Sequence, residues 1–426
     1  MRLSDYEKKM LDGHFGALKR QAMAKTLDYA AVVGAERLCD VSMAHLFCGA
    51  HPYLEVCDGD GFEAVVSEMS FCSKEKLDLK ETAAGVVCQA DVTPLSTNNW
   101  QAMSRDQHRF SRNKEYLARY AAMGVNLVGT CVPYLAGFVP VKGQHYVSSE
   151  SHAVLLMNTL WAAAGQADGI EAGFWAAACG KTPYWGLHDP ANRGGTHLFS
   201  IDVELNTVFD WDLFGHAAGR KIPPRAVPVF KEGFVPPDVF KLKSSFAAMA
   251  TTSGAELSHF VGFSPEAPTP AAAFGGESRI PKEMISITAR DMEDSRQMLD
   301  CGQSEAADYI SLGCPHFAPH QLREVAAFLE GKKVRKKVHI WTAPPFKEVA
   351  DRSGLTETIE AAGAELLAGT CPLVSECLPE GIGSMAFDSA KQAHYMKSSY
   401  PDKKVLYGST LKCLQSALDG RWEGGA

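Results

Sequence analysis

Short apolar runs alternate with longer amphipathic segments in the last third of the chain. The runs at 284–289, 308–312 and 338–343 are rich in branched and aromatic residues, as buried strands are. Segments with helical spacing of apolar positions lie at 290–300 and 319–331, after the first two runs. This alternation predicts βαβ units and a mainly parallel sheet.

The same pattern continues to the end of the chain. Helices are expected at 344–354, 357–363 and 409–420, and strands at 364–370 and 403–408. The stretch GIGSMA (381–386) resembles a dinucleotide-binding pattern, but no strand leads into it, so a loop is expected there.

The first 263 residues follow the pattern less regularly. Strands are expected at 124–130 and 196–205, and the apolar stretch 152–165 is typical of a buried helix. The proline-dense stretch 221–241 is expected to be irregular or to lie at a sheet edge, because proline cannot donate a ladder hydrogen bond. The whole chain is therefore expected to be an α/β protein.

One stretch is typical of a linker. Residues 264–281, SPEAPTPAAAFGGESRIP, are rich in proline, glycine and alanine and contain few large apolar residues. This stretch predicts an N-terminal α/β region at 1–263 and a C-terminal α/β region at 282–426.

Composition excludes several classes of protein. The 426 residues are 46% apolar and carry a net charge of −8, which disfavours nucleic-acid binding, since that needs a basic surface. No run approaches the roughly 18–20 apolar residues of a membrane helix. The polar N-terminus has no secretory apolar region, so the twelve cysteines indicate a reducing cytoplasm rather than a disulfide framework.

Three of the cysteines share one kind of position. Cys131, Cys314 and Cys371 lie in GTCVPYL, LGCPH and GTCPL, each after a predicted strand and before a proline. Ligands bind at the carboxyl ends of parallel strands, and backbone N–H groups there favour thiolate, the form that binds metal. The three thiols could hold an iron–sulfur cluster with one iron open to substrate. Alternatively, each is an ordinary buried thiol.

A zinc site is a second metal hypothesis. In CPHFAPH, Cys314, His316 and His320 could bind zinc and support a hydrolase. Pro319 weakens the helix that would align the two histidines.

The segment 386–395 has the pattern of a helix start. Asp388 or Ser389 is the expected cap, and Lys391 lies in the first turn, where the helix dipole disfavours a cation. Lys391 is thus either a solvated lysine or a cation placed for an anionic substrate.

Taken together, the motifs resemble the large subunit, or large-subunit region, of the aconitase X family. The resemblance runs over nearly the whole chain and is carried, in order, by GTCVPYL, SESHAVLLMNTL, KTPYWGLHDPANRGGTHL, LGCPH, GTCPLV and DSAKQAHY. It implies several α/β/α layers with mainly parallel sheets around a central cleft, aconitase-like but without the swivelling small domain.

The resemblance also implies a set of site residues. Cys131, Cys314 and Cys371 would hold the cluster, [4Fe–4S] in the active form, with [2Fe–2S] or [3Fe–4S] possible in isolated protein. Lys391 would contact the substrate carboxylate. A valine–serine pair of the family falls on Val41 and Ser42, with Ser42 assigned to the catalytic group. A substrate-loop asparagine falls on Asn99, with Asn98 as its competitor.

Other polar residues are candidates to line the substrate pocket. Arginine can pair with a carboxylate through two hydrogen bonds, so Arg193 is a candidate beside Lys391. Arg193 and His188 could equally hold a polar loop, and Glu150 could cap the helix that begins near Ser151. Besides Lys391 and Arg193, the residues predicted to line the pocket are Ser42, His45, Asn99, Glu150, Ser151 and His188.

Two activities are associated with the family, dehydration of cis-3-hydroxy-L-proline and of 5-phosphomevalonate. The segment SMAHLFCG (42–49) is more similar to the hydroxyproline enzymes, which makes cis-3-hydroxy-L-proline the expected substrate. The chain length is more similar to the large subunit of the two-subunit phosphomevalonate enzymes. The resemblance implies that the catalytic serine belongs to a small swivelling-domain partner. A non-catalytic cluster-binding subunit is the remaining alternative.

Overall fold

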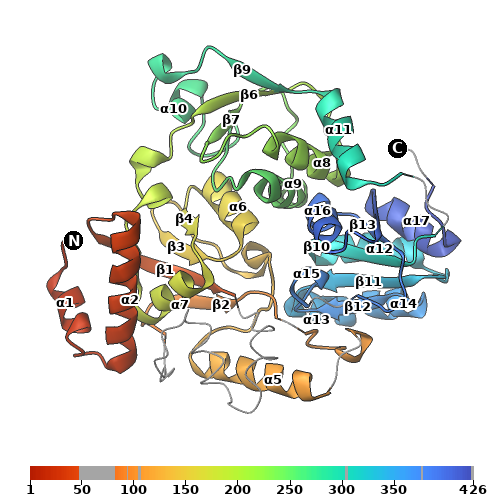
Figure 1. The fold of residues 1–426 in the computed structure, drawn as a ribbon, viewed down its shortest axis with the longest axis horizontal. Helices are drawn as coiled ribbons and strands as arrows, with labels where there is room; N and C mark the ends of the chain where they lie inside the picture. Colours follow the sequence, from red (N-terminus) through yellow and green to blue (C-terminus); the bar gives the residue numbers. More distant parts are fainter. Residues whose placement is uncertain (48–81, 94, 104–106, 303–305, 376–377, 424–426) are drawn as a thin grey trace.

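Three sheets of mainly parallel strands organise the chain, as Figure 1 shows. The computed structural model describes residues 1–47, 82–93, 95–103, 107–302, 306–375 and 378–423. Residues 48 and 49 of the segment SMAHLFCG lie outside the described residues. Within the described part of the chain, no helix is both long and apolar enough to cross a membrane.

The first sheet has the order β2-β1-β3-β4, with β5 paired antiparallel to β1. Its strands are β1 (Leu38–Leu46), β2 (Val87–Ala90), β3 (His145–Ser148), β4 (Ala164–Ala167) and β5 (Lys181–Pro183). The helices of this part are α1 (Asp5–Leu11), α2 (Ala17–Val33), α5 (Gln107–Ala122), α6 (Ser151–Trp161) and α7 (Ile170–Cys179). Helix α7 packs between α2 and the sheet, which buries the apolar side of β1.

The second sheet has the order β8-β7-β6-β9, and all its pairs are parallel. Its strands are β6 (His197–Ile201), β7 (Pro228–Phe230), β8 (His259–Phe260) and β9 (Met284–Ile287). Its helices are α8 (Val208–Gly219), α9 (Val239–Ser253), α10 (Pro270–Phe274) and α11 (Ala289–Leu299). Helices α8 and α9 lie side by side, and α9 packs on α6, within the largest apolar core of the described residues.

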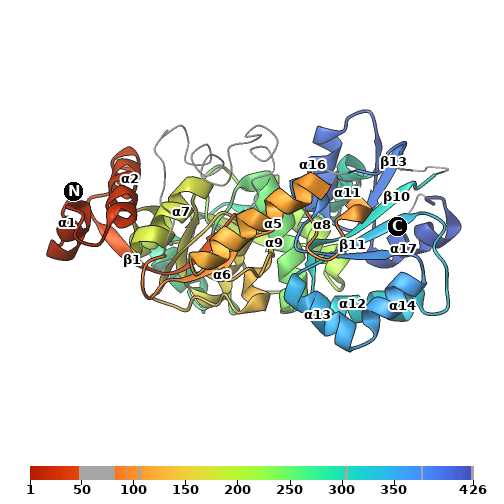
Figure 2. The ribbon, with the colours of Figure 1, turned by 90° about the horizontal axis from the view of Figure 1, so that it is seen from below.

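The third sheet has the order β12-β11-β10-β13-β14 and is parallel throughout. Its strands are β10 (Tyr309–Phe317), β11 (Lys337–Thr342), β12 (Glu365–Ala368), β13 (Ser384–Phe387) and β14 (Lys404–Tyr407). Its helices are α12 (Pro319–Leu329), α13 (Pro344–Arg352), α14 (Leu355–Ala361), α15 (Pro372–Ser375), α16 (Ala390–Ser399) and α17 (Thr410–Asp419). Seen from below in Figure 2, α12, α13 and α14 cover one face of this sheet, and α11 and α16 lie on the other.

The predicted α/β class is confirmed, and three details are corrected. The segment 124–130 forms only an isolated bridge at Asn126, because its carbonyl and amide groups bond across to β2 without forming a ladder. The expected loop at 381–386 contains the start of β13, whose four residues are all buried. Strand β7 lies between β6 and β8 rather than at an edge, since Pro228 occupies its first position, where its missing donor is tolerated.

The division at 264–281 remains a prediction. This stretch forms α10 and a 3₁₀ turn, with Ala273 and Phe274 buried. Strand β9 follows it but pairs with β6 in the second sheet, so the third sheet begins only at β10. The described residues thus form three sheets, whereas composition predicts two regions.

Candidate active site

Two Gly-Thr-Cys segments from distant parts of the chain lie backbone against backbone. A Cβ atom added at Gly129 would lie 3.5 Å from the Cα atom of Gly369. Both glycines have a positive φ, 61° and 85°, which side chains rarely adopt. The glycines therefore allow the segments that carry Cys131 and Cys371 to approach closely.

His316 ties the third cysteine segment to these two. Its Nδ1 atom lies 3.1 Å from the Thr130 hydroxyl, and its Nε2 atom lies 3.0 Å from the Thr370 carbonyl oxygen. Its backbone N–H donates to the Cys131 sulfur at 3.5 Å. Because His316 is two residues after Cys314, its ring and backbone bring all three cysteine segments together.

The three thiols influence one another electrostatically. Burial raises the pKa of Cys314 and of Cys371 to about 12, and raises the pKa of Cys131 well above its usual range. The charge of Cys314 raises the pKa of Cys131, and the charge of Cys371 raises that of Cys314. Such thiols ionise at neutral pH only when a metal compensates their charge. Cys314 also lines a cavity of about 410 Å³.

A buried ion pair lies beside the thiols. The Lys391 ammonium is 2.6 Å from the Glu150 carboxylate, and both side chains are mostly buried, at 14% and 16% exposure. His152 Nδ1 also lies 2.6 Å from Glu150. Burial would raise the pKa of Glu150, but the charges of Lys391 and His152 hold it below its usual range. The negative charges of Glu150 and Cys314 raise the pKa of Lys391 despite its burial, so both groups are charged at neutral pH.

The helix starts that present this pair follow from local sequence. Ser389 caps α16 by accepting from the Gln392 N–H, as expected, and Ala390 N donates to Asp212 of α8 at 2.7 Å. Glu150 is the N-cap residue of α6, and its carboxylate is aimed at Lys391 rather than at its own helix. Glu150 is thus at the expected N-cap position of α6, but its side chain binds Lys391 and makes no capping hydrogen bond.

Sequence reasoning missed an acid and a lysine around the thiols. Burial, and then the charge of Glu150, hold the pKa of Asp91 well above its usual range. Lys243 of α9 is fully buried, and its ammonium donates to the carbonyl oxygens of Pro315 and His316 and to Gln321. Burial lowers the pKa of Lys243 to about 8. Neither residue stands in a recognisable motif, since each is a single polar position in a buried segment.

His45, a predicted pocket residue, lies in the wall of the site. Its ring is fully buried, and its Nε2 atom lies 2.9 Å from the Thr130 carbonyl oxygen. Its Nδ1 atom lies 3.2 Å from the Ser148 hydroxyl. With both ring nitrogens engaged, His45 positions the Cys131 segment rather than facing a cavity.

Several buried polar atoms at the site have no hydrogen-bond partner within the described part of the chain. They include the hydroxyls of Tyr134, Ser149 and Thr370 and the Nε2 atom of His152. Tyr134 and Thr370 belong to the cysteine segments, and the charge of Cys131 raises the pKa of Tyr134 after burial does. Orphaned buried donors of this kind fit a polar group bound among the thiols.

Four predicted residues make no described contact with the thiols. Val41 packs in the core of the first sheet, and the hydroxyl of Ser42 donates to the His145 carbonyl oxygen at 3.0 Å. Asn99 accepts from Ala102 N of the 3₁₀ turn Gln101–Met103, whereas its competitor Asn98 bonds to β12 and is used structurally. Ser151 is partly buried in the first turn of α6.

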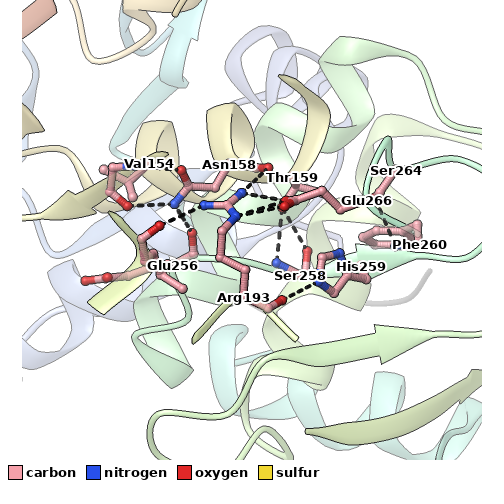
Figure 3. A network of polar contacts seen from close by, with 12 residues as sticks. Val154, Asn158, Thr159, Arg193, Glu256, Ser258, His259, Phe260, Ser264 and Glu266 are labelled. Carbon is pink, nitrogen blue, oxygen red and sulfur yellow. Dashed lines mark hydrogen bonds and ion pairs between the residues drawn. The ribbon is translucent and has the colours of Figure 1, made fainter. Parts of the chain in front are cut away.

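Arg193 and His188 are placed outside the group of thiols. Arg193 binds Glu266 at 2.6 Å and donates to the Asn158 carbonyl oxygen, as Figure 3 shows. It also donates to the Leu187 carbonyl oxygen. These contacts hold a polar loop in place, which is the second of the two roles expected for Arg193, the first being to bind the substrate carboxylate. His188 instead lies beside His145, with 3.1 Å between their Nδ1 atoms.

The zinc hypothesis of Cys314, His316 and His320 is wrong. Both ring nitrogens of the buried His316 are engaged by Thr130 and Thr370. The side chain of His320 is 62% exposed, where it pairs with Glu324 and stacks on Phe240. Helix α12 begins between the two histidines at Pro319, so the rings point into different environments.

Relatives of known name resemble the chain over most of its length. A phosphomevalonate dehydratase large subunit from Methanothermobacter thermautotrophicus is 32% identical over 92% of each chain. A cis-3-hydroxy-L-proline dehydratase from Pseudomonas aeruginosa is 28% identical, over 99% of this chain and 70% of the relative. The crystal structure of Thermococcus kodakaraensis aconitase X (holo-form) shares the fold, with a TM-score of 0.78 and 24% identity over 98% of this chain and 100% of that one.

Sequence models of one family match most of the chain. Residues 1–191 match the aconitase X first domain, residues 195–297 the second domain and residues 307–419 the third domain. These bounds follow the three sheets of the structure. The chain belongs to the aconitase X family.

Proposed function

We propose that the chain is the large subunit of an iron–sulfur-dependent dehydratase that acts on a small hydroxy carboxylic acid. The observation that carries the proposal is the assembly of Cys131, Cys314 and Cys371 beside the buried pair of Lys391 and Glu150. The named relatives, both dehydratases, support the same reaction class.

The donor set fits an iron–sulfur cluster better than a single ion. Among the described residues, the three sulfur atoms do not form a group with all ligand atoms within 4.8 Å of one another, as a mononuclear tetrahedral site needs. Three thiolates can ligate three irons, and a [4Fe–4S] cluster held this way supplies a Lewis acid at its fourth iron. The hydroxyls of Tyr134 and Thr370, buried and unpartnered within the described part of the chain, are donors available to such a group, which supports the proposal.

The ion pair is complementary to a zwitterionic substrate. The Lys391 ammonium can bind a carboxylate, and the Glu150 carboxylate can bind a secondary ammonium group. An α-imino acid carries both charges, on two groups attached to the same carbon atom, whereas a phosphorylated hydroxy acid carries only negative ones. This complementarity favours cis-3-hydroxy-L-proline as the substrate.

The 5-phosphomevalonate alternative is supported by a different observation. The chain aligns with 92% of the Methanothermobacter phosphomevalonate dehydratase large subunit, at the higher identity of the two named relatives. In this reading Lys391 binds the carboxylate, and Glu150 orients the ammonium group of Lys391 rather than the substrate.

A small partner subunit is part of the proposal. Relatives that align over 92–100% of their length are named large subunits, which implies a small subunit. In this proposal Lys391 and Glu150 bind and orient the substrate, and Glu150 is held in its charged form by Lys391 and so is a weak base. We infer that a serine of the partner removes the proton, while Ser42 and Asn99 remain predicted contributors from this chain.

The experiment is anaerobic reconstitution of the chain with a small subunit from the same genome, followed by assays on both substrates. We expect turnover of cis-3-hydroxy-L-proline, an absorbance of the cluster, and loss of that absorbance when each of the three cysteines is replaced by serine. Lys391→Ala should lower kcat/KM by about 100-fold or more, the effect of losing a charged hydrogen bond worth 1.5–3 kcal/mol together with its orientation of the substrate.

Each outcome has a distinct meaning. Turnover of 5-phosphomevalonate alone would replace the substrate assignment and keep the reaction class. Glu150→Gln should raise KM for cis-3-hydroxy-L-proline while the cluster absorbance stays, which separates substrate binding from cluster binding. Unchanged absorbance in all three cysteine variants would overturn the proposal, and cluster binding without turnover of either substrate would support a non-catalytic subunit.

A further inference from the structure

A second group of metal-binding side chains lies in the first sheet. Cys39 of β1, His145 of β3 and His188 of a 3₁₀ turn each offer one ligand atom, and these atoms all lie within 4.8 Å of one another. Cys39 precedes His45 by six residues along β1, which corresponds to about 20 Å of strand. The group is therefore separate from the cysteines of the active site.

We propose that Cys39, His145 and His188 form a binding site for one Zn²⁺ ion. Thiolate and imidazole together are a donor set that zinc prefers, in the tetrahedral geometry of both structural and catalytic sites. This site is independent of the proposed dehydratase activity.

The distances fit a tetrahedral ion. The Nδ1 atoms of His145 and His188 are 3.1 Å apart. Two nitrogens bound to zinc at 2.0–2.1 Å in a tetrahedron lie about 3.3 Å apart, so the rings need to move by only a few tenths of an ångström. Without an ion, the two nitrogens share one proton, and the thiol of Cys39 donates to the Thr182 carbonyl oxygen at 3.6 Å.

The protonation states also suit the ion. Burial lowers the pKa of His188 to about 3 and lowers the pKa of His145, so both rings are neutral at pH 7 and can act as ligands. When zinc binds, the Cys39 S–H bond breaks, a sulfur–zinc bond forms, and one proton leaves to solvent. Burial raises the pKa of the Cys39 thiol to about 12, although the nearby Arg37 guanidinium lowers it, so the thiol keeps its proton until an ion binds.

The surroundings supply the second hydrogen bond that a zinc-bound histidine needs. The Nε2 atom of His188 is buried and makes no hydrogen bond within the described part of the chain. The Ala164 carbonyl lies near enough to raise the pKa of this ring. Zinc at Nδ1 fixes the proton on Nε2, and this carbonyl is then its acceptor. His145 is only partly buried, so solvent reaches this group and water can supply the fourth ligand.

Cobalt binding in the near ultraviolet tests the site directly, because a thiolate-to-cobalt charge-transfer band appears only when a cysteine ligates the ion. The background is the full chain with Cys131, Cys314 and Cys371 replaced by serine, so that the active-site thiols cannot bind cobalt. We expect a single equivalent of Co²⁺ to give the band and Zn²⁺ to displace it. Cys39→Ala should abolish the band, and His188→Ala should reduce cobalt affinity at least tenfold.

Cys88→Ala is the matched control, because Cys88 is another buried thiol of the same sheet. Its band should match that of the background. In the otherwise unaltered protein, elemental analysis should find one zinc that Cys39→Ala removes while the iron content stays. Absence of the band in the background chain, or a band that persists in Cys39→Ala, would overturn the proposal even if one variant folds poorly.

Discussion

At the scale of single residues, the polar side chains around the thiols have two different tasks. Lys391 and Glu150 keep their charges and face the thiols, whereas His45, His316 and Lys243 are fully buried and bind backbone carbonyl oxygens. The second set holds the cysteine segments in place. It explains how three segments far apart in the sequence are held together without disulfides.

Replacing His316 tests this positioning role. His316→Ala leaves the Thr370 carbonyl oxygen without its partner and opens a cavity, so we expect a loss of about 2–4 kcal/mol in the free energy of unfolding and reduced iron incorporation. Urea denaturation and iron analysis measure the two effects. The control is His320→Ala, an exposed histidine on α12, which should change stability by less than about 0.5 kcal/mol. Equal effects of the two substitutions would contradict the role of His316 in holding the three cysteine segments together.

At the scale of elements, the close contact of α8 and α9 decides where Lys243 and Asp212 can lie. A Cβ atom added at Gly215 of α8 would lie 2.0 Å from the Ser245 carbonyl oxygen of α9. Gly215 and Gly219 lie one turn apart, so they form a flat strip on which α9 rests. This close approach brings Lys243 of α9 within hydrogen-bond distance of Pro315, the residue after Cys314 in β10.

The strip predicts a contrast between two helical glycines. Gly215→Ala should destabilise the protein by about 1–3 kcal/mol, because backbone atoms of α9 must move away. Gly173 of α7 meets its nearest side chain at an ordinary 3.7 Å, so Gly173→Ala should be neutral or stabilise by up to about 1 kcal/mol through helix propensity. Thermal unfolding of both variants checks the contrast, and similar melting temperatures would show that the helices can separate without cost.

Asp212 of α8 links this strip to the helix that presents Lys391. Its carboxyl group accepts from Ala390 N at the start of α16 and from the Tyr407 hydroxyl of β14. Burial raises the pKa of Asp212 to about 8. The folded state therefore keeps a proton on Asp212 between its ordinary pKa near 4 and pH 8, where the unfolded state has lost it.

The sign of the pH effect follows from this proton. The contribution of Asp212 to stability falls as pH rises from about 4 to 8, by at most about 1.4 kcal/mol per pH unit. Asp212→Asn keeps an acceptor for Ala390 but cannot ionise, so its stability relative to the native protein should increase over the same range. Chemical denaturation at pH 5, 6, 7 and 8 measures the difference. A constant difference would mean that the carboxylate is charged in the folded state.

Parts of the fold were predictable and others were not, for identifiable reasons. Strands such as β10 and β11 are apolar runs followed by long helices, so sequence spacing alone places them. Strand β13 has four residues and starts with Ser384, and no periodicity can show in so short a run. The cysteines were recognisable because each stands between a short apolar run and a proline, although Cys314 lies within β10 and the run before Cys131 forms no strand. Asp91 and Lys243 reach the site through packing between segments far apart in the sequence.

At the scale of the whole molecule, the site joins two of the three sheets. The segment after β2 runs along β12, where Thr93 N donates to the Gly369 carbonyl oxygen at 2.7 Å and Thr97 N donates to that of Ala368 at 3.0 Å. Asn98 continues this contact through Leu366 and Ala368. The first part of the chain, which carries Cys131, is thereby fixed against the third sheet, which carries Cys314 and Cys371.

A cluster held by thiols from both parts should act as a cross-link of the folded chain. A group that binds only the folded state stabilises it by about 4 kcal/mol when present at a thousand times its dissociation constant. We therefore expect the cluster-loaded protein to unfold at a higher temperature than the cluster-free protein, under anaerobic conditions. Cys131→Ser should remove this difference, because it cuts the only one of the three thiol links that comes from the first part of the chain.

Cys413→Ser provides the control for this comparison, because Cys413 is a buried thiol in the core of the third sheet. The substitution should lower both melting temperatures and leave the difference between them unchanged, since Cys413 lies outside the group of three. A difference that persists in Cys131→Ser would mean that Cys314 and Cys371 suffice to hold the cluster within one part of the chain. The link between sheets would then rest on the backbone contacts along β12 alone.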